Sequence, residues 1–130
     1  MSFASVRLTL AATALVLAAG CSRSDRPLLG TVTGTVMLDG APLGNALVLF
    51  TPEGPGRTSM GATGPDGRYS LTFLRDIMGA NLGRHSVRIT TATKEHGGRE
   101  ILPAKYHAKS TLTADVATGA NTIDFPLTAK

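Results

Sequence analysis

From residue 30 onward, apolar and polar residues alternate with a period of two, which predicts β-strands that bury one face. In Gly30–Leu38 the valines fall on one face and the threonines on the other, and both residue types favour strands. Residues 68–73 and 85–92 alternate in the same way. Residues 45–51 instead hold a continuous apolar run, which favours a strand buried on both faces or in the middle of a sheet.

Turn residues separate these strands. The Asp39-Gly40 pair is a strong hairpin signal, because glycine accepts the positive φ that such turns need. Residues 64–67 (Gly-Pro-Asp-Gly) mark a second turn. A weaker strand at residues 57–63 contains Gly61 and is expected at the edge of a sheet. The predicted strands span seven segments: 30–38, 45–51, 57–63, 68–73, 85–92, 111–116 and 121–127.

Two longer segments lack the alternating pattern. Residues 75–83 hold two glycines and an asparagine and are predicted to form a loop. Residues 94–110 are polar and too long for a hairpin loop, so we expect them to cross from one sheet to the other. Pro126 is expected at a strand end or on an edge, because it cannot donate a ladder hydrogen bond. The sequence therefore predicts an all-β, seven-stranded Greek-key β-sandwich with minimal helix.

The first 21 residues follow a different pattern. Arg7 is followed by an apolar run over residues 8–17, then by small residues and Cys21. The run is too short to span a bilayer, which needs roughly 20 apolar residues, and has the form of a secretory signal. Residues 17–21 (Leu-Ala-Ala-Gly-Cys) resemble the lipobox of bacterial lipoproteins. That resemblance implies cleavage between Gly20 and Cys21, followed by acylation of Cys21.

Three regions result: a lipoprotein signal peptide at residues 1–20, a lipidated cysteine and tether at 21–29, and one domain at 30–130. Cys21 is the only cysteine, so no disulfide can form within the chain and stability must come from an apolar core. The formal net charge is +4, but the basic residues are scattered and tryptophan is absent. Nucleic-acid binding is therefore poorly supported.

The domain also carries a family resemblance. Residues 34–50 read Gly-x-Val-x-x-Asp-Gly-x-Pro-Leu-x-x-Ala-x-Val-x-Phe, which resembles the opening of bacterial carboxypeptidase-regulatory-like domains, also called transthyretin- or prealbumin-like. Residues 63–69 look like the T-x-x-D-G-x-Y hairpin of that family, and residues 103–125 are similar to small exported lipoproteins of the group. The resemblance covers residues 30–128 and implies a seven-stranded sandwich, usually without catalysis.

The three histidines are the candidate metal ligands. A zinc site usually needs three or four converging ligands, often with a short-spaced pair. His85, His96 and His107 are instead spaced eleven residues apart, which favours solvated surface side chains. A small-molecule or metal carrier that uses these three histidines is the alternative function.

Catalytic and calcium-binding motifs find little support. No Gly-x-Ser-x-Gly elbow is present, and the chain lacks the Tyr-Arg-Gly-Ser tail of transthyretin-related hydroxyisourate hydrolases, so we expect no enzyme activity. Asp39 and Asp66 each stand alone beside a turn glycine, which favours turn formation over calcium binding. Tyr69 falls on the core face with its hydroxyl expected to bond to backbone. Tyr106 either packs the long connection onto the sheet or belongs to a recognition surface, and packing is favoured.

Together these features predict a non-enzymatic, lipid-anchored β-sandwich of the bacterial cell envelope. Its role would be to bind or scaffold a protein or glycan partner, with no cofactor. Ser22 after Cys21 favours the outer membrane over the inner one, by resemblance to lipoproteins of well-studied bacteria. The domain would face the periplasm or the exterior. An exposed edge, such as the strand expected at 57–63, would permit pairing with a partner strand.

Overall fold

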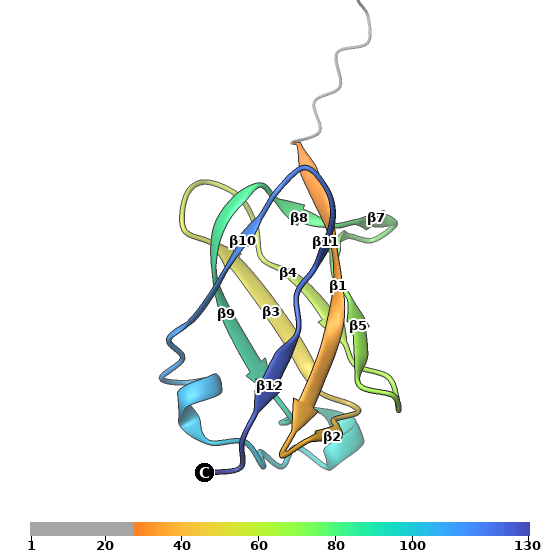
Figure 1. Ribbon diagram of the computed structural model, residues 1–130, viewed down its shortest axis with the longest axis vertical. Helices are drawn as coiled ribbons and strands as arrows, with labels where there is room; N and C mark the ends of the chain where they lie inside the picture. Colours follow the sequence, from red (N-terminus) through yellow and green to blue (C-terminus); the bar gives the residue numbers. More distant parts are fainter. Residues whose placement is uncertain (1–27) are drawn as a thin grey trace, which may run out of the picture.

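The computed structural model describes residues 28–130, which form two β-sheets and two short 3-10 helices (Figure 1). The first, called the β1 sheet, contains β1 (Leu29–Leu38), β2 (Ala41–Pro42), β5 (Arg68–Ser70), β8 (Ala80–Asn81), β11 (Gly119–Thr122) and β12 (Phe125–Leu127). The second, called the β9 sheet, contains β3 (Leu47–Pro52), β4 (Ser59–Ala62), β6 (Thr72–Leu74), β7 (Ile77–Met78), β9 (Gly83–Thr90) and β10 (Leu112–Val116). The helices are η1 (Lys94–His96) and η2 (Ala104–Tyr106).

β1 organises its sheet because its ten residues are long enough to hold several short partners. It pairs antiparallel with β2, β5 and β8, and parallel with β11 and β12. The alternation predicted for this strand is confirmed, with Val32 and Val36 fully buried and Thr33 exposed. Pro126 lies opposite Met37 in β12, whose pairing within the described residues is to β1 alone. The prediction that Pro126 sits on an edge is therefore confirmed.

The β9 sheet runs in the order β10-β9-β3-β4-β6-β7. β3 is in its middle, with Val48 and Phe50 fully buried on one face and Leu49 half-buried on the other, as the continuous apolar run predicted. β4 was expected at an edge, and this is wrong: it lies between β3 and β6. Gly61 allows the backbone of Ser70 to pack closely against β4, since a Cβ at position 61 would lie 2.2 Å from the carbonyl oxygen of Ser70.

The segment predicted as one strand at residues 68–73 changes sheets. β5 pairs with β1, whereas β6 pairs with β4 and β7 in the other sheet. Leu71 lies between them and is 1% exposed. Tyr69 is buried as predicted, while Phe73 is only partly buried. The alternation identified the inward side chains, but it carries no information on which strand is the hydrogen-bonding partner.

Residues 75–83 are not a simple loop, in contrast to the sequence prediction. They contain β7, β8 and the first residue of β9. β8 pairs with the start of β1, and a Cβ on Gly79 would lie 2.6 Å from the carbonyl oxygen of Gly30. Gly79 also has a φ of 118°, a conformation that side chains rarely adopt. Strands of two residues are too short to show a periodic pattern, which explains why the sequence did not predict them.

The prediction that residues 94–110 cross between the sheets is wrong. β9 and β10, which this segment connects, are adjacent antiparallel strands of the same sheet, with Val87 opposite Leu112. The crossing to the β1 sheet occurs instead between β10 and β11, over residues 117–118. The long connection therefore folds back over one end of its own sheet, carrying η1 and η2.

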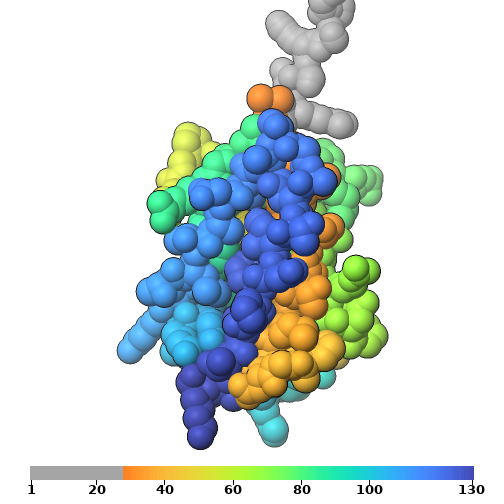
Figure 2. Space-filling model, viewed as in Figure 1, coloured from red at the N-terminus to blue at the C-terminus, as the bar shows by residue number. Residues whose placement is uncertain are grey.

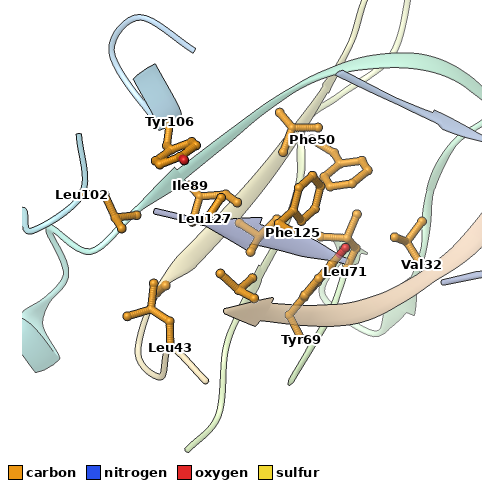
Figure 3. Packing of buried hydrophobic residues seen from close by; sticks show 14 of the residues in the cluster. Val32, Leu43, Phe50, Tyr69, Leu71, Ile89, Leu102, Tyr106, Phe125 and Leu127 are labelled. Atoms are coloured by element: carbon orange, nitrogen blue, oxygen red, sulfur yellow. The ribbon is translucent and has the colours of Figure 1, made fainter. Parts of the chain in front are cut away.

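Side chains from both sheets form one apolar core (Figure 3). The rings of Phe50 in β3 and Phe125 in β12 meet edge to face, with centroids 6.1 Å apart, and Tyr69 lies 6.2 Å from Phe125. Burial of such aromatic and branched side chains is the main favourable term in folding. The chain is thus mostly β with almost no helix, and its two sheets around a shared core are consistent with a β-sandwich.

Candidate functional site

A polar depression lies on the outer face of the β1 sheet, with a volume of about 440 Å³. Figure 2 looks onto the molecule from the side on which β1, β11 and β12 lie side by side. We call this depression the β1 groove. Its lining residues come from β1, β5, β11 and the turn before β12: Thr33, Gly34, Thr35, Arg68, Tyr69, Ser70, Thr122 and Asp124.

Sheet register brings the polar side chains of the β1 groove together. Thr33 lies opposite Ser70 on one side and Thr122 on the other. Thr35 lies opposite Arg68. Because side chains of paired residues share one face of a sheet, these groups form two neighbouring polar rows. The period-two pattern that buries the valines of β1 therefore also places its threonines in this groove.

Gly34 lines the β1 groove, and the chain packs closely against its inward side. A Cβ at this position would lie 1.8 Å from the carbonyl oxygen of Ile123 and 2.9 Å from Cε1 of Tyr69. The Tyr69 hydroxyl donates a hydrogen bond of 2.6 Å to that Ile123 carbonyl, which confirms the predicted backbone bond. Burial, and secondarily the charge of Asp124, raises the pKa of Tyr69, so the phenol remains a proton donor.

Asp124 and Arg68 supply the two charges of the β1 groove. Oδ1 of Asp124 accepts a hydrogen bond of 2.9 Å from the backbone N–H of Thr35, which fixes the carboxylate at the groove wall. The backbone N–H of Arg68 donates to Asp66 at 3.0 Å, while the Arg68 side chain is exposed. The groove thus offers a guanidinium, a carboxylate and several hydroxyls, which are groups that hydrogen-bond to polar ligands.

The structure does not bring the three histidines together. Within residues 28–130, no group of three or more histidine, cysteine, aspartate or glutamate side chains could hold a metal ion. Nε2 of His96 donates to the Gly44 carbonyl at 3.2 Å, and Nε2 of His107 donates to the Leu102 carbonyl at 3.0 Å. Each of these rings therefore holds a different part of the backbone.

His85 is in the core rather than on the surface, which corrects the sequence prediction for this residue. Its side chain is fully buried, with its ring centroid 5.6 Å from that of Phe50. Nδ1 donates to the Gly83 carbonyl at 3.0 Å, whereas Nε2 has no hydrogen-bond partner. Burial lowers the pKa of His85 and so favours the neutral ring. The signal was present in the sequence, since His85 falls on the same alternating face as Val87 and Ile89.

A partly buried cluster around the Glu100 carboxylate is not among the sites predicted from the sequence. Oε2 of Glu100 accepts hydrogen bonds from Thr91 N–H at 2.9 Å, from the Thr91 hydroxyl at 2.8 Å and from Leu102 N–H at 3.2 Å. Oε1 accepts from the Thr90 hydroxyl. Burial alone would raise the pKa of Glu100, but these hydrogen bonds outweigh burial and lower it. These hydrogen bonds hold the long connection (residues 94–110) against the end of β9, and no sequence motif predicts them.

The remaining candidate residues have structural roles. Oδ1 of Asp66 accepts from Arg68 N–H within its turn, and Oδ1 of Asp39 accepts from Ala129 N–H at 3.1 Å. Asp39 and Gly40 both have positive φ, as a tight hairpin requires. Tyr106 is 8% exposed, and its hydroxyl accepts from Thr128 N–H at 3.0 Å. The turn and packing predictions for these residues are confirmed.

Gly20 and Cys21, the predicted cleavage and lipidation residues, lie outside the described part of the chain. Across residues 28–130, none of the helices has the length and apolar character needed to cross a bilayer. A scan against models of known protein families finds no match, and a search of curated proteins also finds none.

Proposed function

We propose that this protein is a non-enzymatic, lipid-anchored module of the bacterial cell envelope that binds a polar partner through the β1 groove. The anchor is carried by one sequence observation: an apolar run that ends in Leu-Ala-Ala-Gly-Cys at residues 17–21. The lipid on Cys21 would confine the domain to the membrane plane and so raise its effective concentration for nearby partners. Ser22 supports an outer-membrane destination, with the domain facing the periplasm or the exterior.

We further propose that the fold is a seven-stranded, Greek-key sandwich of the carboxypeptidase-regulatory-like (transthyretin-like) type. The motifs at residues 34–50 and 63–69 support this assignment. The observed fold agrees with the resemblance at a coarser level, with two sheets, one core and a first strand that pairs with the last. The shortest strands, such as β2, β7 and β8, would then be extensions of the family's longer strands.

The lining of the β1 groove favours a glycan over an apolar peptide. The groove displays hydroxyls of threonine and serine beside Arg68 and Asp124. Its one aromatic side chain, Tyr69, is 3% exposed, and large aliphatic side chains do not line it. A ligand rich in hydroxyl groups can pair with such donors and acceptors, whereas an apolar segment would leave them unpaired.

Lipid anchoring is tested by Cys21→Ser. We expect the wild-type protein to fractionate with membranes and to incorporate labelled fatty acid. The Cys21→Ser variant should lose the label and should leave the outer-membrane fraction. Equal labelling and equal fractionation of the two proteins would refute the anchor.

Glycan binding is tested by titrating the protein with soluble cell-wall glycan fragments and following backbone amide chemical shifts. We expect shifts concentrated in β1, β5 and β11, and a loss of affinity of about tenfold or more in Arg68→Ala, the range for a charge-assisted hydrogen bond. The matched control is Arg99→Ala, an exposed arginine in the long connection. Shifts that cluster elsewhere, or equal affinity losses in the two variants, would refute the assignment to this groove.

A further inference from the structure

Three large apolar side chains are exposed near the end of the molecule at which β1 begins. Leu28, immediately before β1, is 76% exposed, while Met78 is 48% and Leu74 is 38% exposed. Leu74 ends β6 and Met78 ends β7, so both belong to the β6–β7 hairpin. Isolated exposed apolar residues are ordinary on protein surfaces, but several at one end indicate a contact surface.

Pairing with β1 holds this hairpin beside the start of the domain. β8 pairs with β1 through Gly30 opposite Ala80, and Met78 precedes β8 by only two residues. Gly79, between β7 and β8, packs closely against the backbone of Gly30. Figure 1 shows β7 and β8 at the same end of the molecule as the beginning of β1. The hairpin therefore lies next to the start of β1, which is the end of the domain nearest to Cys21 in the sequence.

The length of chain between Leu28 and Cys21 limits how far this end can move from a membrane. Leu28 is seven positions after Cys21, with six residues between them. Even a fully extended chain of that length reaches only about 25 Å. A lipid on Cys21 would thus keep Leu28, and the hairpin held beside the start of β1, within about 25 Å of the lipid anchor.

The hairpin and the adjacent Arg57 carry one net positive charge, from Arg57 and Arg75 against Asp76, which favours an anionic surface. Arg75 lies in the turn between β6 and β7, and the guanidinium of Arg57 lies 5.7 Å from the ring centroid of Phe73 in β6. Asp76, in the same turn as Arg75, offsets one of these charges. Basic residues beside exposed apolar ones are the combination found in proteins that lie at a membrane interface.

We propose that Leu28 and the β6–β7 hairpin form a bilayer-contacting surface, with Leu74 and Met78 entering the interface and Arg57 and Arg75 at the level of the lipid phosphates. This inference rests on the proposed lipid anchor, which supplies the proximity. The contact orients the domain, with β2 away from the membrane. The β1 groove lies on the side of the sandwich and therefore stays open to ligands.

The test uses single tryptophan reporters, because the chain contains no tryptophan of its own. Leu74→Trp places the reporter in the proposed surface, and Ala41→Trp, in exposed β2, is the matched control. Each full-length lipidated protein is reconstituted into vesicles of phosphatidylcholine and phosphatidylglycerol with brominated acyl chains. We expect at least twofold quenching and a blue-shifted emission for Leu74→Trp, and neither effect for Ala41→Trp. Met78→Trp repeats the measurement if circular dichroism shows that Leu74→Trp does not fold.

The possible outcomes separate the two proposals. Vesicle flotation of both variants with equal, weak quenching would overturn the bilayer contact while leaving the anchor intact. Failure of both variants to float with vesicles would overturn the anchor and the contact together. A second copy of the chain covering this surface would leave the Leu74→Trp reporter unquenched and make its blue shift depend on protein density, which would also overturn the contact.

Discussion

Replacement of Glu100 with glutamine should destabilise the protein by about 2 kcal/mol at neutral pH. The carboxylate accepts four hydrogen bonds, two of them from the backbone N–H groups of Thr91 and Leu102. Hydrogen bonds to a charged group contribute roughly 1.5–3 kcal/mol each, against about 0.5–1.5 for neutral pairs. Glutamine keeps one acceptor oxygen, but its NH2 group would face hydroxyl and N–H groups that are themselves donors. Some of the four hydrogen bonds would be weakened and at least one would be lost, which gives the expected destabilisation of about 2 kcal/mol.

The same substitution should remove part of the acid sensitivity of the fold. The folded protein lowers the pKa of Glu100 below its ordinary value of 4.5, so the folded state keeps this charge to lower pH than the unfolded chain. The stabilisation is therefore fully present above about pH 4.5 and is lost as the pH falls through the folded-state pKa. The glutamine variant has no carboxylate to protonate at this position, so it does not lose this stabilisation at low pH. The difference in stability between wild type and Glu100→Gln should therefore shrink on acidification.

Urea denaturation followed by far-UV circular dichroism, at pH 7 and at pH 3, measures both effects. In thermal unfolding, the same 2 kcal/mol loss corresponds to a decrease in Tm of about 10 °C for a domain of this size. Glu95→Gln is the matched control, because Glu95 is exposed in the same connection and should stay within about 0.5 kcal/mol of wild type. Equal stability of Glu100→Gln and wild type at pH 7, or a difference that does not shrink at pH 3, would refute the role assigned to this cluster.

Two further predictions concern the core. Tyr69→Phe removes the hydroxyl that donates a hydrogen bond to the Ile123 carbonyl. We expect the free energy of unfolding, measured by urea denaturation, to fall by about 1–2 kcal/mol. An unchanged free energy of unfolding would mean that water replaces this bond. His85→Leu should flatten the stability profile below pH 6.5, because the folded state lowers the pKa of His85 and wild type loses stability when the unfolded chain takes up the proton. Identical slopes between pH 7.5 and pH 5 for wild type and His85→Leu, in urea denaturation at several pH values, would contradict a neutral buried His85.

The alternation of residue types was sufficient to predict the longer strands and their inward faces. β1, β3 and β9 each overlap a predicted segment and extend one or two residues beyond it, while β10 lies wholly within its predicted segment. Pairing was harder to predict, because it depends on which strands meet in space and not on the pattern within one strand. Leu71 illustrates the limit: its flanking residues alternate without interruption, yet the chain changes sheets there. β4 likewise has a weak pattern but an interior position, because Gly61 lets the backbone of Ser70 approach closely.

The candidate sites divide according to whether their signal is local. Turn aspartates and the Tyr69 hydroxyl follow from nearby residues, so their roles could be predicted. The Glu100 cluster joins residues nine or ten positions apart, and the β1 groove joins β1 to β5 and β11, so neither has a local motif. Both form only once the sheets do.

His85 shows how residue type can mislead where pattern does not. Histidine is a common metal ligand, so three histidines invite a search for a shared site. The period-two pattern of β9 makes a different prediction, since it places His85 with Val87 and Ile89 among inward side chains. Burial of an imidazole is tolerable when one nitrogen has a partner and the ring packs on apolar neighbours, as Gly83 and Phe50 provide. Position on a strand is therefore the stronger guide to this residue's role, because burial excludes the surface chemistry that residue type alone suggests.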